Sequence, residues 1–258
     1  MVHRVASPLR RTIRWFGGLE ATVLAFGVAL VVLLWVFASL TGEVLEGDTQ
    51  AIDEWFVSSL READDPADPR GPEWLEEIGR DATALGGIAW LLFATVAVGG
   101  FLVLARRPHM ATFLLASTLS GLAVSTILKR IFDRPRPDIV PHLSHVYTSS
   151  FPSGHSMLSA VVYLTLGALI STIVKRPILK IYVIAMAGLL AIIVGLSRVY
   201  LGVHYPTDVA AGWMAGLIWA LLCTFAARRL QRKGHVERSG LPDTTDKDND
   251  LSESLPTS

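Results

Sequence analysis

Long apolar runs, separated by short polar segments, dominate the chain from residue 19 to residue 227. A helix that crosses the hydrocarbon layer of a membrane needs about 20 mostly apolar residues. Six runs approach that length, and they cover residues 19–41, 83–105, 110–129, 155–174, 178–198 and 206–227. The pattern predicts an all-α polytopic membrane protein, a bundle of six transmembrane helices whose domain covers residues 19–230.

Two tight, basic junctions between runs support this prediction. Proline discourages continuation of a helix, and it follows a basic pair in residues 106–108 and again in residues 175–177. The first run follows a basic segment, as the apolar part of a signal peptide does. It is longer than the roughly 7–15 apolar residues of a signal peptide, so we expect it to remain as the first helix.

The charges are segregated along the chain, although the formal net charge is zero. Basic residues precede the first run, fill the second–third and fourth–fifth junctions, and follow the sixth run. Counting crossings places all four segments on one face, and the positive-inside rule assigns that face to the cytoplasm. The opposite face receives the loop 42–82, which has thirteen acidic residues and three basic ones. We expect both termini on the cytoplasmic side of the membrane.

Composition narrows the classes of function. The chain of 258 residues is 51% hydrophobic and 18% charged, with a mean hydropathy of +0.45. The zero net charge gives no electrostatic reason to expect a nucleic-acid partner. The single cysteine, Cys223, lies inside an apolar run and excludes an intramolecular disulfide. The high apolar content makes the lipid bilayer the first partner that the sequence implies.

Three segments outside the runs have a composition of their own. The basic residues 1–18 are expected in the cytoplasm, and the polar segment 231–258 predicts a disordered cytoplasmic tail because it has too little apolar content to fold alone. The outer loop 42–82 contains two stretches with helical apolar spacing, at residues 52–60 and 74–78. They are typical of interfacial amphipathic helices, which would anchor the chain or, alternatively, guide lipid to a site.

Polar residues gather at the outer ends of the last four runs. They form three clusters, at residues 129–137 after the third run, 151–155 at the start of the fourth, and 197–208 between the fifth and sixth. The third and fifth runs cross outward, whereas the fourth and sixth cross inward. All three clusters therefore share the face of the acidic loop, where charged side chains avoid the cost of entering hydrocarbon.

Three cations in these clusters, Lys129, Arg136 and Arg198, are suited to binding phosphate. Guanidinium groups make bidentate contacts with phosphate oxygens, and lysine supplies a point charge. Ser153 is a candidate N-cap of the fourth helix, and Gly154 permits close backbone approach. Free N–H groups at a helix N-terminus form an anion site, so these residues together predict a site for a phosphate group.

Two histidines supply the predicted chemistry. Asp208 follows His204 by four residues, across a helix start marked by Pro206. Its carboxylate can hold one imidazole nitrogen of His204 and leave the other free as a nucleophile. His155 would protonate the leaving oxygen and then activate water.

The spacing of these residues resembles the three-part signature of the type 2 phosphatidic acid phosphatase (PAP2) family. The parts are Lys129, Arg136 and Pro137; Pro152, Ser153, Gly154 and His155; and Ser197, Arg198, His204 and Asp208. The resemblance implies a PAP2-like helical bundle and a phosphohistidine at His204, oriented by Asp208, with His155 as acid and base. It also implies that the cations, Ser153 and Gly154 hold the phosphate and that no metal or other cofactor takes part.

The same resemblance implies hydrolysis of a membrane lipid phosphate or diphosphate. Undecaprenyl diphosphate, phosphatidylglycerol phosphate and phosphatidic acid are the candidate substrates. Transfer of the phosphate to an acceptor other than water is one alternative, and a non-catalytic phospholipid binder or transporter is another. A haloperoxidase is disfavoured by the membrane architecture.

Smaller expectations concern residues near the clusters. Asp133 and Arg134 are expected to pair with each other and to shape their loop. Gly212 and Gly216 permit close helix packing, which we expect to be intramolecular. The loop before the fourth run has three residues that could contact a lipid headgroup or simply be solvated: His142, His145 and Tyr147.

Overall fold

The computed structural model describes residues 8–141 and 149–232, and its regular structure in this part of the chain consists of eight helices. They are α1 (Pro8–Glu46), α2 (Gln50–Ser59), α3 (Glu73–Ala84), α4 (Ile88–Leu104), α5 (Pro108–Phe132), α6 (Gly154–Ile173), α7 (Pro177–Tyr200) and α8 (Pro206–Arg232). Helix α1 thus begins inside the segment predicted as a separate N-terminus. The predicted headgroup contacts at His142, His145 and Tyr147 lie outside the described residues, as does nearly all of the predicted tail.

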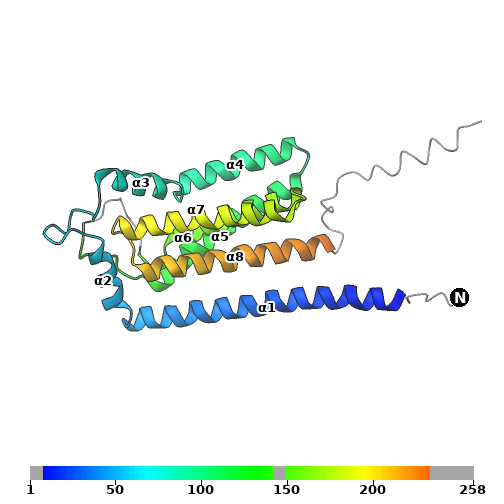
Figure 1. Cartoon of the computed structure of the whole chain (residues 1–258), viewed down its shortest axis with the longest axis horizontal. Coiled ribbons are helices and arrows are strands. Elements are labelled where there is room, and N and C mark those ends of the chain that lie inside the picture. Colours follow the sequence, from blue (N-terminus) through cyan, green and yellow to red (C-terminus); the bar gives the residue numbers. More distant parts are fainter. Residues whose placement is uncertain (1–7, 142–148, 233–258) are drawn as a thin grey trace, which may run out of the picture.

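The helices form an elongated bundle (Figure 1). Helices α1 and α4–α8 run along its long axis, and α2 and α3 lie at the end opposite the start of α1. Helices α1 (from Val23), α5, α6, α7 and α8 are each long and apolar enough to cross a membrane, and α3 with α4 would make a sixth span, bent by 52°. The prediction of an all-α polytopic membrane bundle is confirmed.

The second span differs from the prediction of one continuous run over residues 83–105. Three residues separate the end of α3 from the start of α4, and the chain bends between them. Gly87 precedes α4 in an extended conformation (φ −66°, ψ 142°), and a Cβ at Gly86 would lie 2.3 Å from a methyl carbon of Val194. Close packing against another helix creates this break, so hydropathy along the chain does not detect it.

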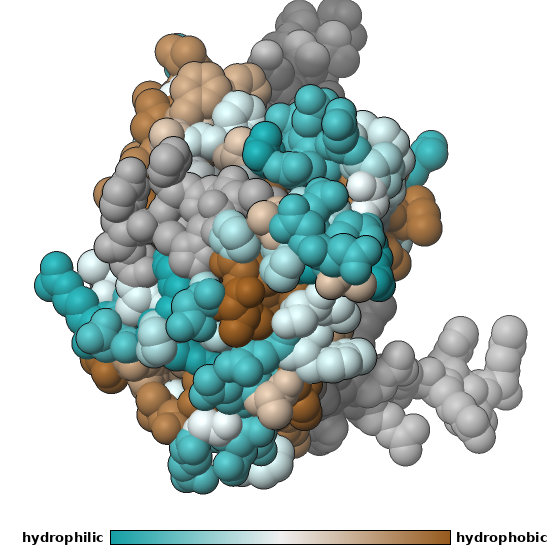
Figure 2. Space-filling view, turned by 90° about the vertical axis from the view of Figure 1, so that its left-hand side faces the viewer, coloured by the Kyte–Doolittle hydropathy of each residue, from teal (hydrophilic) through white to brown (hydrophobic). Residues whose placement is uncertain are grey.

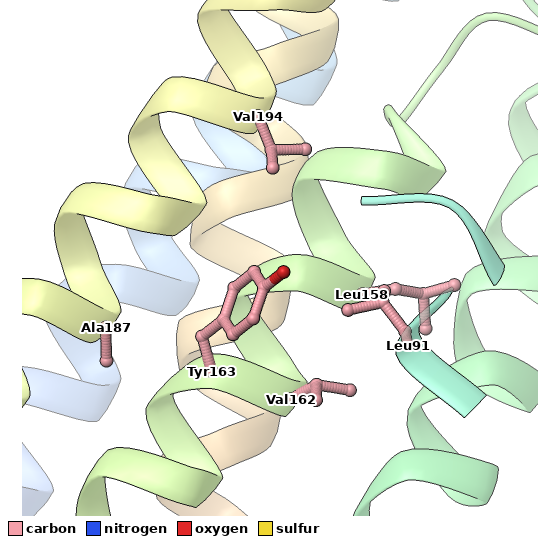
Figure 3. Close-up of a cluster of buried hydrophobic side chains, with 6 residues drawn as sticks. All are labelled: Leu91, Leu158, Val162, Tyr163, Ala187 and Val194. Carbon is pink, nitrogen blue, oxygen red and sulfur yellow. The ribbon is translucent and has the colours of Figure 1, made fainter. Parts of the chain in front are cut away.

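A tyrosine of α6 holds the bend between α3 and α4. Tyr163 Oη donates a hydrogen bond to the backbone carbonyl of Leu85 at 2.6 Å, and Trp90 Nε1 donates to Tyr163 Oη at 3.3 Å. The break therefore does not leave this carbonyl without a partner. Figure 3 shows the apolar cluster around it, which consists of Leu91 from α4, Leu158, Val162 and Tyr163 from α6, and Ala187 and Val194 from α7.

Helix α6 is the centre of the bundle, since it packs against α4, α5, α7 and α8. Two glycines bring α8 close to it. A Cβ at Gly212 would lie 2.6 Å from the carbonyl oxygen of Ser153, and one at Gly216 would lie 2.5 Å from that of Met157. The expected intramolecular packing at these glycines is confirmed, and it fixes the start of α8 against the start of α6.

The sides and one end of the bundle present different surfaces. Large apolar side chains are exposed along the long helices, among them Trp35 of α1, Phe101 of α4 and Ile181 of α7. The end that carries α2 and α3 is largely hydrophilic where it is coloured in Figure 2, with a smaller apolar area near its centre. Extensive exposed apolar surface marks contact with lipid, which agrees with helices that span a membrane.

Candidate active site

A cavity of about 530 Å³ lies between α5, α6, α7 and the bend that precedes α4. Many of its lining residues lie near the end of α5, the start of α6 and the end of α7, at the end of the bundle that carries α2 and α3 (Figure 1). The cavity is lined by members of all three polar clusters. These are Lys129, Arg130, Asp133 and Arg136 from the first, Gly154 and His155 from the second, and Arg198 and His204 from the third. Members of the three clusters that are up to 75 positions apart along the chain thus line one cavity.

The first two cations are held by backbone carbonyls around the cavity. Lys129 lies in the last turn of α5, which continues three residues beyond the predicted end of its run, and its Nζ donates to the carbonyl of Ser149 at 2.7 Å. Arg136 Nη1 donates to the carbonyl of Val203 at 2.7 Å and lies 3.1 Å from Nε2 of His204. Both side chains are therefore fixed before any phosphate binds.

The third cation, Arg198, comes from the last turn of α7 and is 2% exposed. Its Nη1 donates to Thr83 Oγ1 of α3 at 2.8 Å. This contact links the outer amphipathic helix to the wall of the cavity. The sequence pattern predicted Arg198 at the site but not Thr83, because a threonine on an amphipathic helix has no distinctive pattern.

Helix α6 begins at the cavity with the predicted N-cap. Ser153 Oγ accepts hydrogen bonds from the backbone N–H of Ser156 at 3.5 Å and from Ser156 Oγ at 3.0 Å. A Cβ at Gly154 would lie 3.1 Å from Cε of Lys129, so glycine at this position makes room for the lysine. The first turn of α6 and the lysine of α5 consequently form one surface of the cavity.

Asp208 holds one side of the buried His204 ring. Their closest atoms, Nδ1 and Oδ2, are 3.4 Å apart, and Ser150 Oγ donates to the same carboxylate oxygen. Asp208 is the third residue of α8, and its Oδ2 also accepts from the backbone N–H of Tyr205 at 2.9 Å, as an N3 carboxylate does in a capping box. The carboxylate that starts the helix therefore also orients the imidazole.

Burial and nearby cations keep the His204 ring neutral. Burial lowers the pKa of His204 to about 3; hydrogen bonding and charge from Asp208 oppose the shift, whereas Arg136 and Arg198 favour it. A neutral ring that donates from Nδ1 to a carboxylate carries its lone pair on Nε2. That nitrogen is the one beside Arg136, on the cavity side.

His155, the second residue of α6, also lines the cavity. The His155 side chain packs against the α3–α4 bend. A Cβ at Gly86 would lie 3.3 Å from Cδ2 of His155. The bend between α3 and α4, which interrupts the predicted second span, thus positions the His155 side chain. His155 is half-buried, in contrast to His204, which is 1% exposed.

The expected pairing of Asp133 with Arg134 is wrong. Arg134 instead forms ion pairs with Asp208 at 2.7 Å and with Asp53 of α2 at 2.9 Å, while Asp133 ends α5 in the left-handed conformation with an exposed side chain. Ser150 is a further partner of Asp208 that the sequence pattern did not predict. These contacts join residues 58 to 81 positions apart, and local spacing gives no signal for them.

Comparison with known proteins identifies the family. The sequence profile of the PAP2 superfamily matches residues 110–232. Phosphatidylglycerophosphatase B of Bacillus subtilis is 35% identical over 162 residues, which cover 62% of this chain and 78% of the relative. The chain belongs to the PAP2 superfamily.

A second relative and a solved structure extend the similarity. A lipid A 1-phosphatase of Rhizobium johnstonii is 28% identical over 184 residues, covering 62% of this chain and 71% of the relative. The crystal structure of a transmembrane PAP2 type phosphatidylglycerolphosphate phosphatase from Bacillus subtilis superposes with a TM-score of 0.70 at 31% identity. That alignment covers 79% of this chain and 98% of the other.

Proposed function

We propose that this PAP2 protein is a membrane-embedded phosphatase that removes the terminal phosphate from a lipid phosphate or diphosphate. Nε2 of His204 attacks the phosphorus while the bond to the lipid oxygen breaks and His155 gives that oxygen a proton. His155 then takes a proton from water, whose oxygen attacks the phosphohistidine. The products are the dephosphorylated lipid and inorganic phosphate, and both histidines return to their starting state.

The observation that carries this proposal is the geometry around His204. Its Nδ1 is held by Asp208, whereas its Nε2 lies 3.1 Å from the guanidinium of Arg136 at the cavity. A phosphorus atom that approaches Nε2 would bring its oxygens within reach of Arg136, and Lys129 and Arg198 line the same cavity. Fixed positive charge around the transferring group stabilises the transition state without reorganisation.

The same cations support a reaction without a metal ion, because they provide the neutralising charge that a metal supplies in other phosphatases. In the described ranges, no group of three or more His, Cys, Asp or Glu side chains is arranged to hold a metal. In this proposal Ser153 and Gly154 contribute the start of α6 as part of the phosphate site.

We place the active site on the non-cytoplasmic face of a bacterial cytoplasmic membrane. Segregation of charge along the sequence supports this orientation, since the basic junctions lie at one end of the bundle and the acidic loop 42–82 lies at the cavity end (Figure 1). Residues 1–18 and 231–258 would then face the cytoplasm.

The substrate is proposed from two observations. The cavity lies between transmembrane helices and has apolar lining at Ile88, Leu122 and Leu158, which suits an acyl or prenyl chain. The two similar phosphatases, by their names, act on phosphatidylglycerophosphate and on lipid A. Phosphatidylglycerol phosphate is therefore the first candidate, ahead of undecaprenyl diphosphate and phosphatidic acid.

A lipid panel tests this function. Purified full-length protein in vesicles is given each candidate lipid in the presence of EDTA, and release of inorganic phosphate is measured. We expect turnover of at least one lipid, and an acid-labile phosphoenzyme that is absent from His204→Ala. Turnover by His204→Ala equal to that of the wild type would contradict the nucleophile, and accumulation of a phosphorylated acceptor without free phosphate would favour a transferase.

A further inference from the structure

We propose that Arg134 and Asp53 are positioning residues for Asp208. Together they form a brace, by which we mean the ion pairs and hydrogen bonds that link the outer helix α2 to Asp208 at the start of α8. The inference deepens the proposed function and rests on it. Neither residue belongs to the sequence signature, and neither lines the cavity.

Arg134 bridges two carboxylates. Its Nη1 donates to Asp208 Oδ1 at 2.7 Å, and its Nη2 donates to Asp53 Oδ2 at 2.9 Å. The guanidinium carbon also lies 4.5 Å from the centre of the Tyr205 ring. The planar fork of arginine is rigid, so it fixes the distance and the plane of both carboxylates in a way that a lysine does not.

The two oxygens of Asp208 have separate partners. Oδ1 accepts from Arg134, whereas Oδ2 accepts from Ser150 and from the N–H of Tyr205 and faces Nδ1 of His204. Without the partner on Oδ1, the carboxylate could rotate about its χ2 bond and move Oδ2 away from the imidazole. Arg134 therefore holds the nucleophile in place through Asp208.

Asp53 holds Arg134 from the opposite side and is itself fully buried. Its Oδ1 accepts from the backbone N–H of Thr207 at 3.2 Å, and its Oδ2 accepts from Thr207 Oγ1 and from Thr49 Oγ1. Thr207 lies in the first turn of α8, where backbone N–H groups have no partner within the helix. A carboxylate from α2 thus caps the helix that carries Asp208.

The charges favour this arrangement over a role in binding phosphate. Burial alone would lower the pKa of Arg134, but Asp208 and Asp53 raise it more, so the net shift is upward. The positive charge is thereby matched to two carboxylates, and the Arg134 side chain is only 11% exposed. Arg136, Lys129 and Arg198 face the cavity instead and provide the cations for the substrate.

The brace gives the outer loop 42–82 a structural role besides anchoring the chain at the membrane interface. On α2, Ile52, Trp55 and Phe56 are exposed, whereas Asp53 and Val57 are buried against the bundle. An apolar face suited to the membrane interface and a carboxylate that reaches the active site thus belong to one ten-residue helix.

Variants of the full-length protein test the brace, with phosphate release from the lipid that the wild type turns over. We expect Arg134→Gln to lower kcat about 100-fold and Asp53→Asn about 10-fold, by analogy with the losses of about 10–100-fold when a partner that orients a metal-binding side chain is removed. The KM and the inhibition constant of inorganic phosphate should change by less than about threefold, since the phosphate site is intact. Arg134→Lys should recover part of the lost kcat because it retains the charge.

A double variant provides the second readout. Asp53→Asn combined with Arg134→Gln should be no slower than Arg134→Gln alone, because both substitutions act through one carboxylate. Arg80→Gln and Asp48→Asn remove exposed charges from the same end and should leave kcat unchanged. Thermal unfolding midpoints report whether each variant is folded, and Arg134→Lys and Asp53→Asn decide the question if Arg134→Gln does not fold.

The outcomes separate the brace from the function on which it rests. If folded Arg134→Gln keeps the wild-type kcat, the brace alone is overturned. If Arg134→Gln is unfolded, a wild-type kcat in both Arg134→Lys and Asp53→Asn overturns the brace alone. A phosphate inhibition constant that rises in parallel with the loss of kcat also overturns it, because Arg134 would then contact the phosphate. A wild-type protein that releases phosphate from no lipid overturns the proposed function and the brace together.

Discussion

The two walls of the cavity differ in how they are held. The polar wall is formed by the segments that precede α6 and α8. There His204 lines the cavity and is 1% exposed, and Asp208 (0% exposed) and Ser150 join it from behind in one hydrogen-bonded group. The apolar wall is the part of α4 and α5 around Ile88, Leu122 and Thr126, away from Lys129; Ile88 is 50% exposed there and Thr126 is also exposed. One wall is rigid and polar, and the other is open and apolar.

This difference assigns the chemistry to the polar wall and the binding of the lipid chain to the apolar wall. A nucleophile must be aligned within a few tenths of an ångström, and buried hydrogen bonds supply that alignment before substrate arrives. A lipid chain presents no polar groups to align, so the wall that receives it needs only apolar surface. We therefore expect substitutions on the first wall to act on kcat for every substrate, whereas those on the second should act on lipids alone.

The largest expected effect is that of Asp208→Asn on the polar wall. Asparagine keeps the shape but lacks the negative charge that orients His204 and stabilises the positive charge formed on attack. We expect kcat to fall about 10³–10⁴-fold, as for the carboxylate of other oriented histidines, with little change in KM. Phosphate release is the measurement, and Asp81→Asn, an exposed aspartate of α3, is the control. A loss below tenfold would contradict the orienting role.

His155→Gln should have the next largest effect, and its size should depend on the leaving group. A lipid alkoxide needs a proton as it departs, so we expect kcat for a lipid substrate to fall about 10²–10³-fold. With 4-nitrophenyl phosphate, whose leaving group needs little help, the first step should persist and phosphoenzyme should accumulate as a burst of nitrophenol. Equal losses for both substrates and no burst would argue against His155 as the acid and base.

A smaller effect is expected on the apolar wall, from Thr126→Trp. The indole would narrow the side of the cavity beside Leu122, and we expect kcat/KM for a long-chain lipid to fall about tenfold, or about 1.4 kcal/mol. Activity on 4-nitrophenyl phosphate should stay within twofold. Thr112→Trp is a matched control, because Thr112 is an exposed threonine of α5 that also bonds the carbonyl four residues before it. Equal losses on both substrates would mean that the tryptophan disturbs the polar wall.

The polar wall also shows which parts of the site the sequence could predict. His204 and Asp208 are four residues apart at a helix start, so their contact follows from local geometry. Lys129, His155 and Arg198 could be assigned to one face because each lies at the end of an apolar run whose direction follows from counting crossings. Short-range spacing and topology were sufficient for these residues.

The remainder depends on tertiary contacts that a single sequence does not encode visibly. Asp53 is one of thirteen acidic residues in the outer loop, and only its burial against Arg134 distinguishes it from the other twelve. Gly86 and Gly87 looked like ordinary members of an apolar run, although the packing of Val194 and His155 ends the helix there. In both cases the decisive partner is more than 60 residues away.

The smallest expected effect concerns stability rather than rate, and it tests how firmly the polar wall is closed. The pKa of His204 is about 3 in the folded protein, against about 6.5 for a solvated histidine. Between these values the unfolded chain binds a proton at this ring and the folded protein does not, so the free energy of unfolding should decrease as the pH falls below 6.5, by up to about 1.4 kcal/mol per pH unit. Above pH 7 the ring should contribute no pH dependence to the free energy of unfolding.

We expect the thermal unfolding midpoint of His204→Asn to fall less than that of the wild type between pH 7 and pH 5. His109→Asn, at an exposed position in the first turn of α5, should keep the wild-type slope. A His204→Asn variant with the wild-type slope would mean that solvent reaches the ring and that the polar wall is open like the other.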